Sequence, residues 1–334
     1  MLHSLVPAFA QAQMDGGYGL ASGAGDFDLL VVDQDLDKDR HIWGKVFGDT
    51  ADNSMGGLDF LLQLISSRPY KLLADVQGAC YERAIWGHEL MLYSGGGWTN
   101  ETHMTGFVHA ARRLVNAPIQ ATGPPRLLLV ERRNSSAWGR WIDNFANLHA
   151  TAEQWANDHP ALVSGVEVAD FSDLAWSDQL RLAARMRLLF GAHGDGLSWS
   201  VFMGAGSALL EAVPAREAGF QACVEGMNAN PYGIFGGVAR LAGVAHFCFL
   251  NDASKVLAFQ HDEKDLFQWG WRQLNLHIDL EKFSEVLAEA ARFVGDSNVA
   301  KKKRECICYQ VFLTNPKFEE LTVLQSSGMG YRDA

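Results

Sequence analysis

The sequence has few cysteines and a deficit of basic residues, and each shortage excludes a class of protein. Its five cysteines are scattered between Cys80 and Cys308, too few for a disulfide-rich scaffold, although they leave room for one or two bridges. The 28 lysines and arginines are outnumbered by 39 acidic residues, and the net charge of −11 disfavours nucleic acid or an anionic membrane as the main partner. We therefore expect no nucleic acid partner, whereas a few local donors could still hold a small polyanion.

Long apolar runs and several familiar catalytic patterns are also missing. No stretch approaches the roughly twenty apolar residues that cross a bilayer, and no basic segment follows Met1, so we expect neither a membrane anchor nor a targeting segment in this chain. His-Glu-x-x-His, Gly-x-Ser-x-Gly and Walker A patterns are absent, which leaves zincin, α/β-hydrolase and P-loop functions without support. A length of 334 residues with 48% hydrophobic content predicts two domains with separate cores.

Short apolar runs alternate with helical patterns along the chain, which predicts an α/β fold with parallel strands joined by helices. The predicted strands cover residues 27–33, 71–76, 126–130, 165–171, 187–190, 207–213 and 245–250. The predicted helices cover residues 107–115, 141–158, 178–186, 232–243 and 280–293, and residues 191–203 are predicted to form a glycine-rich turn followed by a short helix. The segment 118–125 is rich in Pro and Gly and suits a linker. We therefore predict an N-terminal domain over 1–120, a C-terminal domain over 124–295 and a tail over 296–334.

The run 188–203 is the sharpest local feature, because an apolar strand leads into a glycine turn and then a helix. Ligands of doubly wound sheets bind at the carboxyl ends of the strands, which is where this turn falls. Glycines allow close approach of the backbone, and free N–H groups at a helix start favour a phosphate. His193 ends the strand, and a ring N–H there could donate to a diphosphate oxygen. A structural turn with a hydrogen-bonded histidine is the alternative interpretation.

Two further strand ends carry charged residues. Arg132 and Arg133 directly follow the strand 126–130, and a planar guanidinium can bind two phosphate oxygens at once. Glu211 lies near the end of the strand 207–213, where its carboxylate could accept hydrogen bonds from ribose hydroxyls. Solvated arginines, and a glutamate in a cap or salt bridge, are equally compatible with the sequence.

An ordered series of motifs between residues 127 and 214 resembles glycosyltransferase family 61. In that family, a hydrophobic strand precedes an Arg, a second Arg, an Asn before a helix, an Asp-Gln-Leu helix, a strand with His-Gly-Ala-Gly-Leu, and a strand that closes with Glu. The corresponding residues here are, in order, Arg133, Arg140, Asn144, Asp178-Gln179-Leu180, His193-Gly194-Asp195-Gly196-Leu197 and Glu211. The order of the whole set is more specific than any single member. Asp195 departs from the pattern, because it replaces the usual alanine.

Weaker similarity extends toward the N-terminus. The segment 80–87 looks like the family's Cys-(Phe/Tyr)-x-x-Ala stretch, and Leu2-His3-Ser4 looks like the end of its early His-containing motif. The resemblance thus implies that the first domain lacks its N-terminal part.

The resemblance implies a GT-B-like fold of two facing Rossmann-like α/β domains, and an inverting glycosyltransferase that needs no metal and no cofactor. It further implies transfer of GlcNAc or xylose from a UDP-sugar to a hydroxyl of a protein or glycan acceptor, in the endoplasmic reticulum or Golgi lumen. The residues it implies for the donor are Arg133, Arg140, Asn144, His193, Gly194, Asp195, Gly196, Leu197, Ser198 and Glu211. The catalytic candidates are His193 for the leaving group, and His3, Asp33 or Asp35 as the base.

Two other functions stay open at this stage. Asp33 and Asp35 follow an apolar run, and a strand followed by Asp-x-Asp is how metal-dependent GT-A glycosyltransferases hold a divalent cation; a solvated acidic loop is the alternative. The carboxylate of Asp195 near the expected diphosphate, together with an incomplete first domain, is instead compatible with an inactive module that binds a glycan or a protein.

Overall fold

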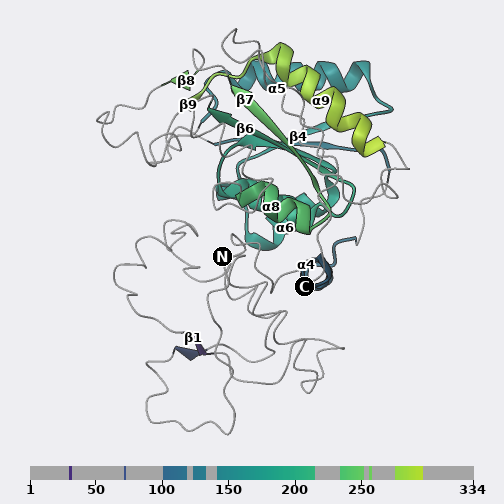
Figure 1. The fold of residues 1–334 in the computed structure, drawn as a ribbon, viewed down its shortest axis with the longest axis vertical. Coiled ribbons are helices and arrows are strands. Elements are labelled where there is room, and N and C mark those ends of the chain that lie inside the picture. Colours follow the sequence, from purple (N-terminus) through teal and green to yellow (C-terminus); the bar gives the residue numbers. More distant parts are fainter. Residues whose placement is uncertain are drawn as a thin grey trace, which may run out of the picture. The chain divides into compact units, whose positions relative to one another are not determined.

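The structure is a computed structural model of the chain, and the residues it describes fall in two compact units. The described residues are 30–31, 71–72, 101–118, 123–132, 141–214, 234–251, 256–257 and 275–295. One unit contains α4 and residues 171–184, and the other contains the main sheet with its covering helices (Figure 1). Within these described ranges, no helix combines the length and the apolar character needed to span a bilayer.

A five-stranded parallel sheet is the centre of the second unit. Its strands, in spatial order, are β4 (Val166–Ala169), β3 (Leu127–Val130), β5 (Leu188–Ala192), β6 (Ala208–Pro214) and β7 (Ala245–Asn251). The predicted α/β class with parallel strands is therefore confirmed. The strand order reverses between β3 and β5, because β4 lies on one side of β3 and every later strand of this sheet lies on the other. Such a reversal opens a crevice at the carboxyl ends of the two strands.

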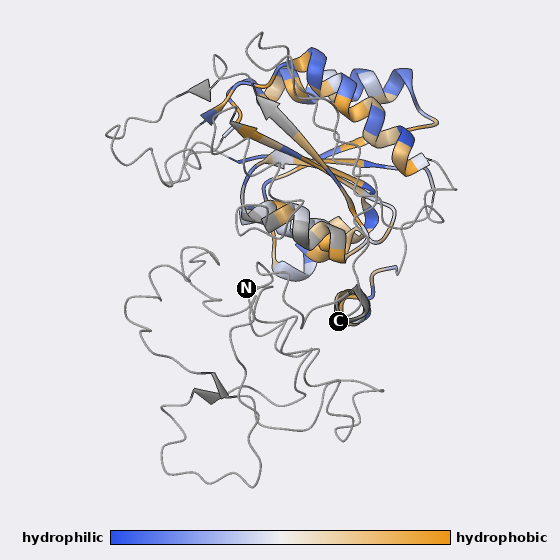
Figure 2. Ribbon diagram, viewed as in Figure 1, coloured by the Kyte–Doolittle hydropathy of each residue, from blue (hydrophilic) through white to orange (hydrophobic). Residues whose placement is uncertain are grey.

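Both faces of this sheet are covered, because alternate residues of its apolar strands point to opposite sides. On one side, α5 (Phe145–Asp158) and α9 (Leu280–Gly295) pack on a cluster of buried residues that includes Leu129, Phe190 and Phe247. On the other side lie α8 (Ile234–Leu241) and the 3-10 helix η5 (Asp195–Phe202). Figure 2 shows α5 and α9 with apolar and polar residues alternating at helical spacing, as expected for helices that bury one side.

Helix α5 begins later than the sequence indicates, at Phe145 instead of residue 141. Trp141 accepts a backbone hydrogen bond from Leu276 N at 2.9 Å, and Ile142 forms an isolated bridge with the same residue. The side chain of Asn144 then bonds the backbone of Ile278. These extended-chain contacts hold residues 141–144 out of the helix.

The glycine run also divides differently from the prediction. Gly191 and Ala192 are the last residues of β5, and only Asp195–Phe202 is helical, as a 3-10 helix. Glycine is needed at 191 because a Cβ there would lie 3.0 Å from Leu197 Cδ2 and 3.1 Å from Val130 Cβ. The close approach of η5 to β3 and β5 therefore depends on this one missing side chain.

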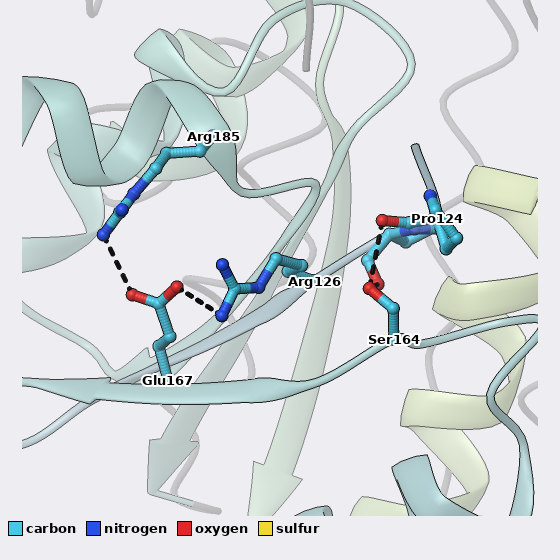
Figure 3. A network of polar contacts seen from close by, with 6 residues as sticks. Pro124, Arg126, Ser164, Glu167 and Arg185 are labelled. Carbon is cyan, nitrogen blue, oxygen red and sulfur yellow. Dashed lines mark hydrogen bonds and ion pairs between the residues drawn. The ribbon is translucent and has the colours of Figure 1, made fainter. Parts of the chain in front are cut away.

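The amino edge of the sheet carries an exposed polar network (Figure 3). Glu167 on β4 pairs with Arg126 at 2.7 Å and with Arg185 at 3.1 Å, and both arginine side chains are more than 40% exposed. Ser164 donates its hydroxyl toward the carbonyls of Pro124 and Pro125. These contacts join the starts of β3, β4 and β5.

The first unit contains α4 (Glu101–Leu114), which begins earlier than the predicted residue 107. The buried residues of this helix recur at helical spacing: Met104, Phe107, Val108 and Ala111. The first turn is mostly polar, so the hydrophobic pattern did not indicate that the helix begins there. The fully buried Arg112 donates to the carbonyls of Pro118 and Ala184, and burial lowers its pKa to about 10. It remains protonated at neutral pH and ties α4 to residues 171–184.

The remaining elements are short or close to their predicted positions. They are β1 (Leu30–Val31), β2 (Lys71–Leu72), η4 (Phe171–Asp173), α6 (Trp176–Arg185), β8 (Val256–Leu257) and β9 (Asn275–Leu276). β1 and β2 pair in parallel inside two predicted strands. The predicted strand 165–171 is shorter than expected, because Phe171 begins η4 and the strand ends at Ala169.

Candidate functional site

The carboxyl edge of the sheet brings the chain after β3 and the chain after β5 to neighbouring positions. Leu129 on β3 is paired with Phe190 on β5, so the two strands end side by side. Glu131 N donates to Ala169 O at 2.9 Å, and His193 N donates to Ala212 O at 2.9 Å, which extends both ladders by one residue. His193 thus lies at the carboxyl end of a strand, as predicted, and the structure adds that the strand order reverses next to this strand.

The turn after His193 is built by small residues and one buried leucine. Gly194 is buried and its carbonyl accepts a hydrogen bond from Leu197 N at 2.9 Å. The Leu197 side chain is 0% exposed and packs against Gly191, so only its backbone is suited to meet a ligand. Gly196 and Ser198 are half-buried. Asp195 opens η5.

Glu211 lies between two histidines on the face of the sheet covered by α8 and η5. Its Oε1 accepts a short hydrogen bond from His193 Nδ1, and its Oε2 accepts one from His246 Nε2 at 2.7 Å. All three residues are at most 5% exposed. The sequence predicted a contact between Glu211 and ribose hydroxyls. In the structure, both carboxylate oxygens of Glu211 already accept hydrogen bonds inside the protein, one from the end of β5 and one from the neighbouring strand β7.

Glu211 is ionised in this cluster. Burial opposes the charge, but attraction to His193 and hydrogen bonds from both histidines outweigh it and lower the carboxyl pKa to about 2. An ionised carboxylate only accepts hydrogen bonds, so each histidine must donate from the nitrogen that faces it. The protons are thereby assigned to Nδ1 of His193 and Nε2 of His246.

Asn144 lies at the start of α5 and binds the chain that leads into α9. Its Nδ2 donates to Ile278 O at 2.8 Å, and its Oδ1 accepts from Ile278 N at 2.9 Å. The side chain is 8% exposed. In this structure Asn144 therefore fastens the junction of α5 and α9, a role that the sequence did not indicate; its predicted contact with the donor stays a prediction.

Several predicted residues lie outside the described part of the chain. They are His3, Asp33, Asp35, Arg133 and Arg140. Arg132, which is described, is half-buried two residues beyond β3. Among the described residues, no group of three or more His, Cys, Asp or Glu side chains is arranged to hold a metal ion.

Sequence reasoning missed two buried polar residues of this region. His246 is the second residue of β7, and it becomes visible only when β7 is paired with β6. Ser200 on η5 is 1% exposed, and its hydroxyl has no hydrogen-bond partner. A polar residue inside an apolar strand was the available signal for His246; the sequence around Ser200 carries none.

The chain that carries this geometry is similar to a known protein family. The family model for Glycosyltransferase 61 matches residues 6–210, which is more than half of the chain. The chain belongs to glycosyltransferase family 61. It is therefore a glycosyltransferase, and its substrates are a sugar donor and an acceptor. No match to a curated protein reaches significance.

The region matched by glycosyltransferase family 61 includes β3, β5, His193 and the glycine turn, and it ends at Leu210 on β6. The strand reversal between β3 and β5 therefore lies inside the family region. Glu211 directly follows the last matched residue, and His246 lies further along the chain. The contacts of these two residues come from the structure of this protein.

Proposed function

We propose that this glycosyltransferase is inverting and metal-independent, and that it moves GlcNAc or xylose from a UDP-sugar to a hydroxyl of a protein or glycan. One observation carries the proposal: the glycine turn with His193 lies at the carboxyl edge where the order of β4, β3 and β5 reverses. Parallel α/β sheets bind nucleotides in such crevices. In this proposal the sheet domain holds the donor and faces the N-terminal domain, as in GT-B enzymes.

The proposed reaction is a single displacement. A base takes the proton of the acceptor hydroxyl while its oxygen forms a bond to the anomeric carbon from the opposite side of the leaving group. The bond from that carbon to the diphosphate breaks, and the electron pair leaves on UDP. Arg133, His193 and the amides after Gly194 would stabilise this charge. His3, Asp33 and Asp35 are the candidates for the base.

We also propose that the protein acts in the endoplasmic reticulum or Golgi lumen. The sulfur of Cys248 on β7 is in a disulfide, whose other cysteine lies outside the described residues. Disulfides persist in oxidising compartments and are rare in the cytosol, which supports a lumenal location.

The proposal is tested by thermal unfolding of the purified protein with excess UDP, with and without EDTA. Ligand at about a hundred times its Kd adds roughly 2.7 kcal/mol of stability, enough for a shift of a few degrees. The decisive variant is Arg133→Gln. Arg126→Gln is its matched control, because Arg126 lies at the amino end of the same strand and pairs with Glu167.

We expect a UDP shift that survives EDTA, persists in Arg126→Gln and disappears in Arg133→Gln. A shift abolished by EDTA would instead favour metal-dependent transfer through Asp33 and Asp35. A folded protein without any UDP shift would favour a binding module. Incubation with UDP-GlcNAc or UDP-xylose, followed by NMR of the product anomer, then tests inversion.

A further inference from the structure

Of the five cysteines, Cys248 is the one that falls within the described residues, in the middle of β7. Its side chain is 4% exposed, and its sulfur is in a disulfide. The cysteines that could supply the other sulfur are Cys80, Cys223, Cys306 and Cys308. A disulfide requires two Cα atoms within about 7 Å of each other, so the surroundings of Cys248 discriminate between these four.

The side chain of Cys248 points to the face of the sheet that α8 covers. Side chains alternate along a strand, so Cys248 shares its face with His246, two residues earlier. His246 donates to Glu211, and a Cβ on Gly236 of α8 would lie 2.7 Å from Nδ1 of the His246 ring. Phe247 points the other way, into the buried cluster that α5 and α9 cover. The sulfur bonded to Cys248 therefore lies on the α8 side of the sheet.

The start of α8 lies at the same height on the sheet as Cys248. Phe235, the second residue of α8, meets the ring of His193 edge-on, with centroids 5.0 Å apart. His193 donates to Glu211, which is paired with Cys248 in the register of β6 and β7. Residues 215–233 connect the carboxyl end of β6 to this start of α8. The end of that connection necessarily reaches the part of the sheet that carries Cys248.

The two C-terminal cysteines follow an element on the opposite face of the sheet. Cys306 and Cys308 come after α9, which packs on the buried cluster with α5. This helix ends at the amino edge, where Arg187, directly before β5, donates to Val294 O at 2.9 Å. A chain that leaves this end has to pass around the sheet and along its other face to reach Cys248. Its route disfavours both cysteines.

The division of the chain into units separates the two cysteines that remain. Cys80 falls in residues 1–92, which belong to the other compact unit, whereas Cys223 belongs to the unit of the sheet. Cys223 is also part of the connection between β6 and α8. It is thus the cysteine whose segment has to reach the face to which Cys248 points.

We propose that Cys223 and Cys248 form a disulfide, which fastens the connection between β6 and α8 to the sheet. The two thiols lose two protons and two electrons as the S–S bond forms, and a disulfide such as oxidised glutathione takes them up and becomes two thiols. The link closes a loop of residues 223–248, which contains α8. It thereby holds α8 over the buried carboxylate of Glu211. This disulfide does not depend on the identity of the sugar donor.

Tryptic mapping of the unreduced wild-type protein identifies the partner without any variant. The protein is purified from a eukaryotic secretory host, denatured, treated with iodoacetamide to block free thiols, and digested. Cleavage after Arg240 separates the two cysteines into peptides 217–240 and 241–255. Mass spectrometry before and after reduction then shows which peptide is linked to 241–255.

We expect peptide 241–255 to be linked to 217–240, and reduction to separate them. The other cysteines fall in peptides 72–83 and 305–317, and a link to either of these would overturn the inference. An alkylated, unlinked Cys248 would overturn it as well. Because this mapping uses no ligand, its result stands whether or not the same protein binds UDP.

Thermal unfolding tests whether the disulfide stabilises the domain. Cys223→Ser should lower the Tm by roughly 5 to 10 °C, because the unfolded loop is no longer constrained. Dithiothreitol should lower the Tm of wild-type protein by a similar amount and have a much smaller effect on Cys223→Ser. The matched control combines Cys306→Ser with Cys308→Ser and should keep the wild-type Tm and its sensitivity to dithiothreitol.

Hydrogen exchange then locates the effect. In Cys223→Ser, the backbone amides of α8 should exchange faster than in the control, while those of α5 on the opposite face keep their rates. Equal exchange of α8 in both proteins, or an equal effect of dithiothreitol on Cys223→Ser and wild type, would overturn the fastening of α8. If Cys223→Ser does not fold, the peptide map of wild-type protein still decides the pairing.

Discussion

Two carboxylates of the same sheet each lie between two basic side chains, one at either edge. Glu167, near the amino edge, pairs with Arg126 and Arg185, as Figure 3 shows. Glu211, toward the carboxyl edge, accepts from His193 and His246. The contacts are similar in kind and length, but the Glu167 side chain is 22% exposed and that of Glu211 is 5% exposed.

Burial makes these two similar arrangements very different in their consequences. Water and salt screen the attraction between the charges of an exposed ion pair, so removing one partner lowers the stability only a little. A buried carboxylate has no water to replace a lost partner, so its hydrogen bonds fix the positions and protons of its neighbours. The comparison indicates that the amino edge joins strands, whereas the carboxyl edge holds specific side chains in one state.

The largest expected difference is between the loss of stability on removing the carboxylate of Glu211 and that on removing the carboxylate of Glu167. Glu211→Ala should lower the free energy of unfolding by about 3 to 5 kcal/mol, because two buried histidines lose their acceptor. Glu167→Ala should cost under about 1 kcal/mol, because its arginines are exposed. Urea unfolding followed by circular dichroism at pH 7 measures both, and equal losses would contradict the comparison.

The pH dependence of stability should differ almost as much. The carboxyl pKa of Glu211 is lowered in the folded protein from its ordinary 4.5 to about 2. Its contribution is therefore present above pH 4.5 and is lost as the pH falls toward 2, by up to roughly 3 kcal/mol. Unfolding measured at several pH values should show that Glu211→Gln lacks this part of the acid sensitivity. The same loss in wild type and variant would refute the assignment.

A smaller effect is expected at Asn144 and Ser164, whose side chains form hydrogen bonds with the backbone of distant segments. Asn144→Ala should cost about 2 kcal/mol, because it leaves the buried N–H and C=O of Ile278 without their partner. Ser164→Ala at the amino edge should cost under about 1 kcal/mol, since Pro124 is exposed and the carbonyl of Pro125 keeps its hydrogen bond from Ser164 N. Thermal unfolding gives these values. UDP titration of folded Asn144→Ala also decides whether Asn144 additionally contacts the donor, because a purely structural asparagine leaves UDP affinity unchanged.

The smallest expected effects come from adding one methyl group at each edge. Gly191→Ala should cost about 1 to 2 kcal/mol, because the new Cβ crowds Leu197 and Val130. Gly165→Ala, where a Cβ meets nothing within 4 Å, should be neutral or gain up to about 1 kcal/mol from a less flexible unfolded chain. Paired melting curves test this difference, and a stabilised Gly191→Ala would disprove tight packing of η5 on the sheet.

The sequence predicted the parts of the fold that depend on neighbouring residues. All four residues of β3 are buried, and such short apolar runs are visible without any partner. The predicted start of α5 was wrong, because the true start depends on contacts with Leu276 and Ile278, which lie far along the chain. The 3-10 form of η5 was missed because its mostly apolar residues give no clear period.

The site residues also fall into those that the sequence could predict and those that it could not. His193 and its glycine turn were recognisable, because the spacing of glycines after an apolar strand is a local pattern. The partners of Glu211 were not, since His246 lies in a strand whose register with β6 only the fold establishes. The hydrogen-bond role of Asn144 was hidden for the same reason.

The two hydrogen bonds between the Asn144 side chain and the backbone of Ile278 also have a consequence for the synthesis of the protein. The two residues are 134 positions apart, so α5 can leave the ribosome complete while the contacts that fix its start do not yet exist. At the usual 5 to 20 residues per second, that interval is roughly seven to twenty-seven seconds. Throughout it, Asn144 lacks the backbone partner that it has in the folded protein, and the sheet domain is still incomplete.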